Sequence, residues 1–175
     1  MTRILIGFAM AVVLALTSGA QAKALELTFQ KLVSEEARII VKMPGEAKEE
    51  KQENGGLKFV VIPSTSTKYW VQYTDLDLEE SDLSGQDKQT LLKRFQDSFR
   101  EGTSVSKEKE LSLGDNKIPG REFTMELIPN CFVRVQVFLE GKRLFFLCVM
   151  SVADEDYLNG NDADTFFDSF EITAK

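Results

Sequence analysis

Apolar and polar positions alternate along most of this chain, and such alternation predicts a protein built largely of β-strands. The strongest pattern is a hairpin: one strand over residues 131–139, a turn at Glu140-Gly141, and a return strand over 142–151. Large apolar side chains fall on both faces of this hairpin. We therefore expect it to lie at the centre of a sheet that is covered on two sides.

Further short strands are expected on either side of the hairpin in the sequence. They end at Pro, Gly or Asn positions, which are typical of turns. The most charged of them, over residues 105–113, is expected at a sheet edge. The other strand ranges are 25–33, 38–43, 57–62, 68–74 and 121–128.

Two helices are predicted from apolar residues at helical spacing. Ser84 and Asp87 resemble a capping box at the start of a helix over 87–101, and Gly102 follows as its C-terminal glycine. The apolar stripe of this helix is formed by Leu91, Leu92, Phe95 and Phe99. Phe166, Phe167 and Phe170 recur in the same way near the C-terminus. We expect an α+β fold: an α/β/α sandwich with a mostly antiparallel sheet of six or seven strands and helices on both faces.

The first 22 residues have the features of a secretory signal peptide. Arg3 supplies a positive charge, residues 4–16 are apolar, and Ala20 and Ala22 occupy the small positions of a cleavage site. The apolar stretch is shorter than the roughly 20 residues of a membrane-spanning helix. We therefore expect residues 23–175 to form one exported domain, periplasmic or extracellular, with no transmembrane segment after cleavage. Cleavage would leave 20 basic and 28 acidic residues, a net charge of −8.

Composition excludes several classes of function. The chain contains no histidine, so a Ser-His-Asp or Cys-His catalytic unit and an imidazole-ligated zinc site are impossible within it. The net charge of −7 argues against a nucleic-acid partner, because phosphate contacts need a basic surface. No G-x-S-x-G or glycine-rich phosphate loop is present. We expect a protein that is not an enzyme and has no cofactor.

Two acidic loops, residues 75–82 and 154–164, are the candidates for binding a divalent cation. Calcium prefers several oxygen ligands from one loop. The first loop offers Asp75, Asp77 and Glu79, and the second offers Asp154 and Asp156. Neither loop has the spacing of an EF-hand, so solvated loop charge explains them better. Calcium binding stays open as the alternative.

The two cysteines, Cys131 and Cys148, lie on adjacent strands of the predicted hairpin. A turn at Glu140-Gly141 would place Cys148 opposite Val133 and leave the thiols as diagonal neighbours on one face. That arrangement favours two buried free thiols over a disulfide, although a shifted register would align them. The disulfide therefore remains an open alternative.

The aromatic residues Tyr69, Trp70 and Tyr73 are the candidates for binding a partner. Trp70 is the single tryptophan, and it lies on the opposite strand face from the two tyrosines. Aromatic side chains concentrate at interface hot spots. Packing in the core is the more common role of such residues, and both interpretations stay open at this point.

Several short motifs resemble the PsbP-like superfamily, whose fold is shared with Ran-binding nuclear import factors. They cover nearly the whole chain after residue 22: residues 41–45 (VKMPG), 69–76 (YWVQYTDL), Leu91-Leu92, 118–122 (IPGRE), 135–147 around Gly141, and 166–172 (FFDSFEI). The chain is similar to the small secreted bacterial members. The resemblance implies an α/β/α sandwich around an antiparallel sheet, and roles in assembly, stabilisation or protein binding. It implies no common active site.

We therefore expect an exported, non-catalytic accessory or interaction protein of the cell envelope, whose partner is an envelope protein. The alternative is a module that binds a small ligand or a divalent cation at the two acidic loops.

Overall fold

The structure is a computed structural model that describes residues 27–53, 55–77, 85–100 and 103–173, without the side chains of residues 85–87. The predicted signal peptide, Glu79 of the first acidic loop, and Ser84 and Gly102 at the ends of the first helix lie outside the described residues. Within the described ranges, neither helix is long and apolar enough to span a bilayer.

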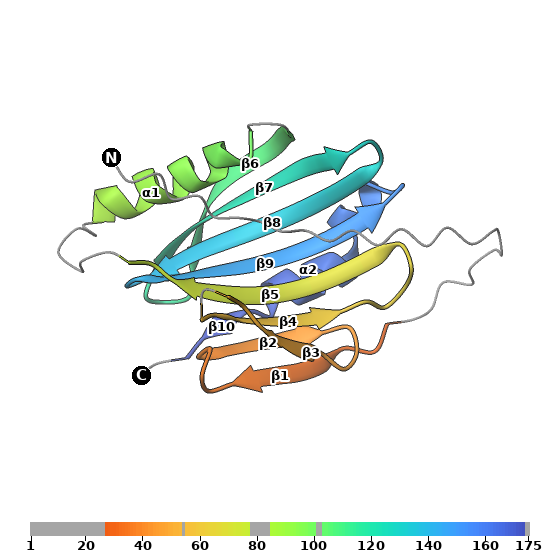
Figure 1. The fold of residues 1–175 in the computed structure, drawn as a ribbon, viewed down its shortest axis with the longest axis horizontal. Coiled ribbons are helices and arrows are strands. Elements are labelled where there is room, and N and C mark those ends of the chain that lie inside the picture. Colours follow the sequence, from red (N-terminus) through yellow and green to blue (C-terminus); the bar gives the residue numbers. More distant parts are fainter. Residues whose placement is uncertain (1–26, 54, 78–84, 101–102, 174–175) are drawn as a thin grey trace.

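The strands form one large and one small antiparallel sheet (Figure 1). The large sheet has seven strands in the order β3-β4-β5-β9-β8-β7-β6, and the small one has three in the order β1-β2-β10. The strands are β1 (Gln30–Ser34), β2 (Ile39–Met43), β3 (Lys48–Lys51), β4 (Leu57–Val61), β5 (Thr67–Asp75), β6 (Ser104–Leu113), β7 (Ile118–Ile128), β8 (Cys131–Glu140), β9 (Arg143–Val152) and β10 (Glu171–Ile172). The helices are α1 (Gly85–Ser98) and α2 (Asn161–Asp168), with a short 3-10 helix, η2 (Asp156–Asn159), before α2.

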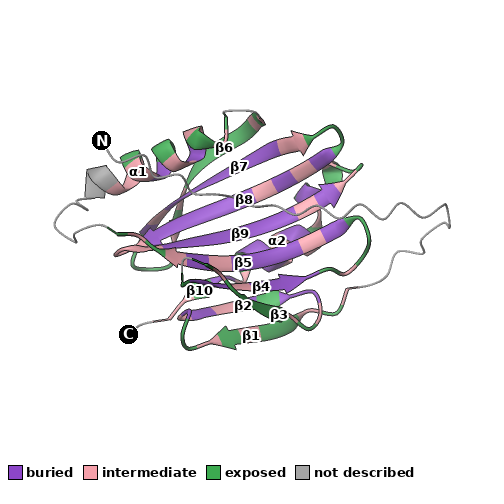
Figure 2. Ribbon diagram, in the orientation of Figure 1, coloured by how far each residue is buried: buried purple, intermediate pink, exposed green. Residues whose placement is uncertain are grey.

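The hairpin of β8 and β9 lies in the middle of the large sheet, as predicted. Figure 2 shows that buried residues concentrate on these central strands and exposed residues on β1 and β3. The charged strand β6 is at one edge, also as predicted. Charged side chains at a sheet edge remain hydrated and discourage pairing with another chain.

The predicted register of this hairpin is wrong by two residues. The turn is formed by Gly141 and Lys142, so Glu140 pairs with Arg143 and Cys148 lies opposite Val135. Gly141 has a φ of 56°, a left-handed conformation that glycine adopts without steric cost. A shift of two residues keeps every side chain on its predicted face, since the side-chain period of a strand is two.

Helix α1 packs against strands of the large sheet. The rings of Phe95 and Phe146 lie 4.9 Å apart, and those of Phe99 and Phe123 lie 5.7 Å apart. Leu92, which is fully buried, belongs to the same apolar cluster as Trp70 and Cys148. The predicted stripe of this helix therefore packs on the sheet as expected.

Helix α2 and the small sheet share a second apolar cluster with the large sheet. The ring of Phe166 packs edge-on against Tyr69 at 5.4 Å, while Ile39 and Val41 of β2 belong to the same cluster. The small sheet is a departure from the expected single sheet. The sequence pattern predicts its first two strands but not β10. That strand has two residues and forms through pairing with β2, which is distant in the sequence.

Strand β3 is the second element that the pattern does not predict. All four of its residues, Lys48–Lys51, are exposed and charged, so the segment has no alternation of apolar and polar positions. It pairs with β4 at the edge of the large sheet. Backbone pairing alone forms this strand, and backbone pairing leaves no signal in side-chain hydropathy.

Candidate functional site

Strand β5 carries the three aromatic residues that were candidates for binding a partner. Alternation along the strand places Tyr69 and Tyr73 in the apolar cluster that includes residues of α2 and β2, and Trp70 in the cluster that includes residues of α1. All three side chains are buried, with exposed fractions of 0, 5 and 3 %. Their roles differ, because their polar atoms meet different neighbours.

Tyr69 is a core residue with a paired hydroxyl group. Its hydroxyl lies 2.7 Å from that of Tyr157, and its ring contacts Phe166. Burial, followed by the hydrogen bond with Tyr157, raises the pKa of Tyr69 above the usual tyrosine value. This tyrosine stays neutral at any physiological pH, and its hydroxyl holds η2 against the sheet.

Tyr73 belongs to a charged bridge at one end of β5. The Arg143 guanidinium lies 4.0 Å from the Tyr73 ring centre and donates two hydrogen bonds to Asp75, of 2.7 and 2.8 Å. Arg143 also donates to the backbone oxygen of Glu36 in the β1–β2 turn. The hydrogen bonds from Arg143 lower the pKa of Asp75. This bridge connects the small sheet to the large one, so Tyr73, Asp75 and Arg143 have a structural role.

Trp70 has a different environment, between two lysines. It lies opposite Val60 of β4 and Cys148 of β9. The Nζ atoms of Lys58 and Lys68 are 5.5 and 5.7 Å from the centre of its indole ring. Cation–π contacts at these distances contribute about 0.5–1 kcal/mol when exposed and about 2 kcal/mol when desolvated.

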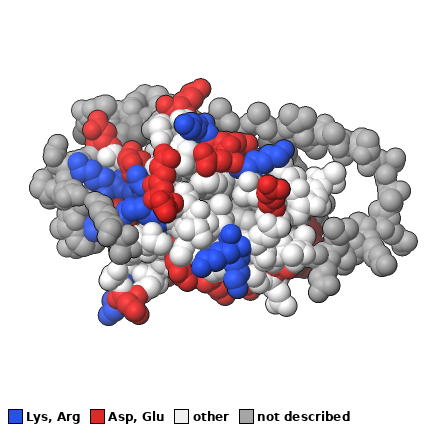
Figure 3. All heavy atoms as spheres, turned by 90° about the horizontal axis from the view of Figure 1, so that it is seen from below, with Lys and Arg blue, Asp and Glu red and all other residues white. Residues whose placement is uncertain are grey.

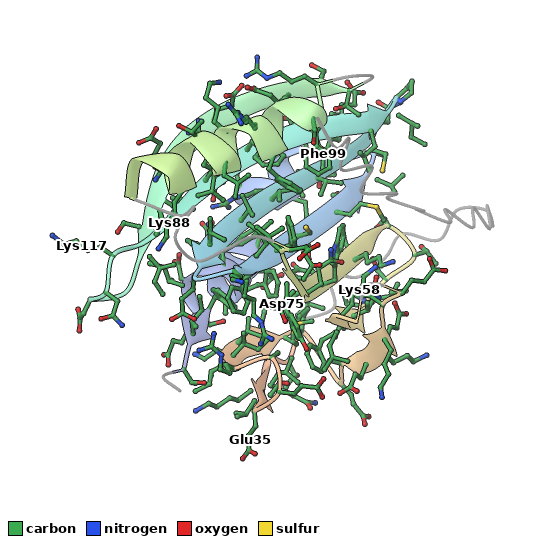
Figure 4. The ribbon with its side chains drawn as sticks, turned by 60° about the vertical axis from the view of Figure 1, so that its left-hand side comes forward. Glu35, Lys58, Asp75, Lys88, Phe99 and Lys117 are labelled. Carbon is green, nitrogen blue, oxygen red and sulfur yellow. The ribbon has the colours of Figure 1, made fainter. Side chains whose placement is uncertain are left out.

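Neither lysine forms an ion pair with a described residue. Figure 4 labels Lys58 at the part of the sheet that β4 and β5 form. Burial, followed by the neighbouring charge of Lys68, lowers the pKa of Lys58, and Glu50 across the β3–β4 pair offsets this only in part. The indole Nε1 of Trp70 is buried and has no hydrogen-bond partner. We call Lys58, Lys68 and Trp70 the lysine–tryptophan site.

The acidic loops do not converge on a shared site among the described residues. Asp75 is held by Arg143, and Asp154 accepts a hydrogen bond of 3.1 Å from the backbone N–H of Tyr157. Asp77 and Asp156 are both exposed. In the described part of the chain, no group of three or more acidic or cysteine side chains is placed to hold a metal ion. Calcium binding stays a prediction.

Cys131 and Cys148 are both buried and free. Cys131 lies opposite Val152, and Cys148 lies opposite Val135. The two cysteines are therefore offset by four residues along the paired strands. They are farther apart than the predicted register would place them. Burial raises the pKa of both thiols, which keeps them protonated and unreactive.

A buried polar network between β7, β8 and α2 was not among the predicted sites. Glu122 accepts hydrogen bonds from Gln136 and Arg134, and Arg134 donates to Asp164 of α2. Beside it, a shallow groove is lined by Lys42, Asn161, Asp164, Thr165, Asp168 and Ser169. The sequence signal is that polar residues replace apolar ones at every second position of β7 and β8, at Glu122, Thr124, Arg134 and Gln136.

Charge on the surface is mixed. On the face seen from below, acidic and basic side chains lie beside one another (Figure 3). Opposite charges at this spacing neutralise one another locally. That face therefore has no extended region of a single sign among its described residues.

The fold recurs among solved structures. Cyanobacterial PsbP (CyanoP) from Synechocystis sp. PCC 6803 aligns with a TM-score of 0.55 and 11 % identity, over 88 % of this chain and 98 % of that one. The Ran-binding protein Mog1p from Saccharomyces cerevisiae aligns with a TM-score of 0.49 and 9 % identity, over 83 % of this chain and 96 % of that one. No protein-family model and no curated protein matches the chain. At this identity the likeness to PsbP concerns the fold alone, and it confirms the predicted PsbP-like fold.

Proposed function

We propose that this chain is an exported, non-catalytic accessory protein of the cell envelope that acts by binding another protein. The lysine–tryptophan site is the observation that carries the proposal. It places two lysine ammonium groups, neither in an ion pair with a described residue, over the buried indole ring of Trp70. A carboxylate of a second molecule would form charge-assisted hydrogen bonds with these ammonium groups. The PsbP-like resemblance, with its roles in assembly and protein binding, agrees with this function.

The arrangement of buried charges supports a protein without catalysis. Glu122 is held by Arg134, Lys109 and Gln136, and Arg121 donates to Gln96 and Glu110. A general acid or base must exchange its proton during each turnover. Side chains engaged in this way are suited to stabilising a fold rather than to exchanging protons.

The finer architecture that we propose is a sandwich with a helix on each face of the large sheet. The two helices contact sheet residues whose side chains point in opposite directions from the strands, and these contacts support the proposal. Phe95 of α1 packs against Phe146, whereas Phe166 of α2 packs against Tyr69. The small sheet extends the layer that contains α2.

Export is tested by mass spectrometry of the protein recovered from its own cells. We expect an N-terminus at Lys23 and recovery outside the cytoplasm. A chain that retains Met1 and stays with the cytoplasmic fraction would contradict the export part of the proposal.

Partner binding is tested by cross-linking the purified protein in its own envelope extract. We expect one protein to be cross-linked repeatedly and to be displaced by excess unlabelled protein. A heat-unfolded sample is the control for non-specific capture. If both samples retain the same proteins, the chain is not an interaction protein of this kind.

Substitution of Trp70→Ala separates the two interpretations of this residue. If Trp70 takes part in partner binding, the variant loses the cross-link at a temperature at which it is still folded. If Trp70 serves only in packing, the variant loses stability, by about 3–5 kcal/mol for a buried tryptophan. Thermal unfolding and cross-linking on the same sample distinguish these results.

A further inference from the structure

We infer that the lysine–tryptophan site recognises a carboxylate on an acidic segment of the partner protein. The inference rests on the proposed function and names the chemistry of the partner. A carboxylate would accept hydrogen bonds from the ammonium groups of Lys58 and Lys68, beside the indole ring of Trp70.

The two lysines lie on either side of Trp70. Lys58 on β4 and Lys68 on β5 lie on the same sheet face, on opposite sides of Trp70 along the strands. Both side chains are half-buried, and both Nζ atoms lie over one indole ring. Lysine stems commonly cover apolar surface while the charged end stays in water. The stems therefore shield the indole, and the ammonium groups remain accessible to a ligand.

The charge of the two lysines is only partly balanced. Two like charges around one ring repel each other, and neither lysine forms an ion pair with a described residue. Glu50, which lies opposite Lys58 across the β3–β4 pair, offsets this charge only in part. A bound carboxylate would supply further counter-charge.

The indole of Trp70 lies beneath both ammonium groups. Its side chain is 3 % exposed, and its Nε1 atom is buried without an acceptor. A carboxylate bound by the two lysines would therefore lie close to the ring without entering the core. The buried indole N–H reports such binding through a change in its surroundings.

The size of the site favours a protein carboxylate over a nucleic acid. Two lysines match one or two carboxylates, whereas nucleic-acid binding needs a row of phosphate contacts. The net charge of −7 would oppose a long polyanion. A short acidic segment of a folded partner meets the site without bringing a high charge density to the rest of the surface.

The experiment follows the indole of Trp70 by ¹H–¹⁵N NMR. Because Trp70 is the single tryptophan, the protein gives one indole N–H resonance. The probe is an acetylated and amidated hexaglutamate peptide, with hexaglutamine and inorganic phosphate as comparison ligands. We expect a saturable shift of this resonance with hexaglutamate only, weakened by added salt.

The matched variants are Lys58→Gln with Lys68→Gln, and Lys31→Gln with Lys117→Gln. Both pairs remove two positive charges, but Lys31 and Lys117 are exposed and lie on β1 and in the β6–β7 turn. We expect the first pair to weaken hexaglutamate binding roughly tenfold or more, and the second to change it less than about threefold. Circular dichroism verifies that both variants fold.

The possible results test the carboxylate site and the proposed function separately. Equal affinity in both variant pairs, a shift with hexaglutamine, or saturation by phosphate alone overturns the carboxylate site. If hexaglutamate binds as expected but no envelope protein is cross-linked, the site stands and the proposed function fails. If an envelope protein cross-links equally well to the Lys58→Gln, Lys68→Gln variant, the function stands and the site is wrong.

Discussion

Arg134 and Glu122 form an ion pair between neighbouring strands inside the protein. Nη2 of Arg134 lies 3.0 Å from Oε2 of Glu122, and their side chains are only 11 and 8 % exposed. Charges this deeply buried are costly when unpaired, so each side chain depends on the other. Asp164 and Gln136 complete the network and connect α2 to the sheet.

Substitution of Arg134→Met should therefore destabilise the protein strongly. We expect the free energy of unfolding to fall by about 3–5 kcal/mol, because Glu122 loses a partner in the interior. Adding Glu122→Gln to this variant should recover a large part of the loss. The control is Arg100→Met, whose partly exposed pairs with Asp97 and Glu108 contribute less than about 1 kcal/mol. Urea unfolding measures all four proteins, and no recovery in the double variant would contradict the expectation.

Acid should destabilise the protein partly through Glu122. Burial opposes its ionisation, but hydrogen bonds from Gln136, Lys109 and Arg134 outweigh burial and lower its pKa. A lowered folded-state pKa gives stability that is present above the unfolded value, about 4.3, and is lost as the pH falls through the folded value. We expect unfolding free energy measured between pH 6 and pH 3 to fall less steeply in Glu122→Gln. Parallel curves for the variant and the natural protein would contradict this.

Gly120 is required by the ring of Phe138. A Cβ atom at position 120 would lie 2.4 Å from Cδ1 of Phe138 and 2.8 Å from the backbone oxygen of Val137. We expect Gly120→Ala to cost about 1–3 kcal/mol by overpacking. In a Phe138→Leu background the same change should cost less, because one of the two clashes is relieved. Thermal unfolding of the four proteins tests the coupling, and additive effects would contradict it.

The two thiols should be unreactive until the protein unfolds. Cys131 and Cys148 are 4 and 3 % exposed, and burial raises the pKa of both. We expect Ellman's reagent to react slowly with the folded protein and to titrate two thiols in guanidinium chloride. Absence of thiols in the denaturant would indicate a disulfide, and fast reaction of the folded protein would show that the thiols are accessible.

Side-chain alternation predicted the central hairpin because strand parity depends on local sequence. Val133 and Phe146 fall on one face and Phe138 and Phe145 on the other, as expected. The predicted register is wrong because the pattern assigns Lys142 to the return strand, whereas this residue belongs to the turn. Hydropathy does not distinguish these positions, since a lysine suits a turn and a strand end equally well.

The candidate site was only partly predictable. Trp70 was singled out by its residue type, and the opposite placement of Tyr69 follows from alternation. Lys58 was not identified, because it is twelve residues from Trp70 in the sequence and the pairing of β4 with β5 brings it to the ring. The partnerless indole N–H also depends on tertiary neighbours, so no sequence pattern indicates it.

Residue types and their spacing are enough to predict the strand and helix periods, the two apolar faces of the hairpin and the charged edge strand, and the lack of histidine excludes catalysis by imidazole. These properties depend on residue type and on spacing within one element. The separate small sheet, the pairing of Glu122 with Arg134 and the position of two lysines over Trp70 follow only from the folded arrangement of the strands. Each of these depends on which distant strands pair, and the free energy of that pairing comes from the whole core rather than from any local pattern.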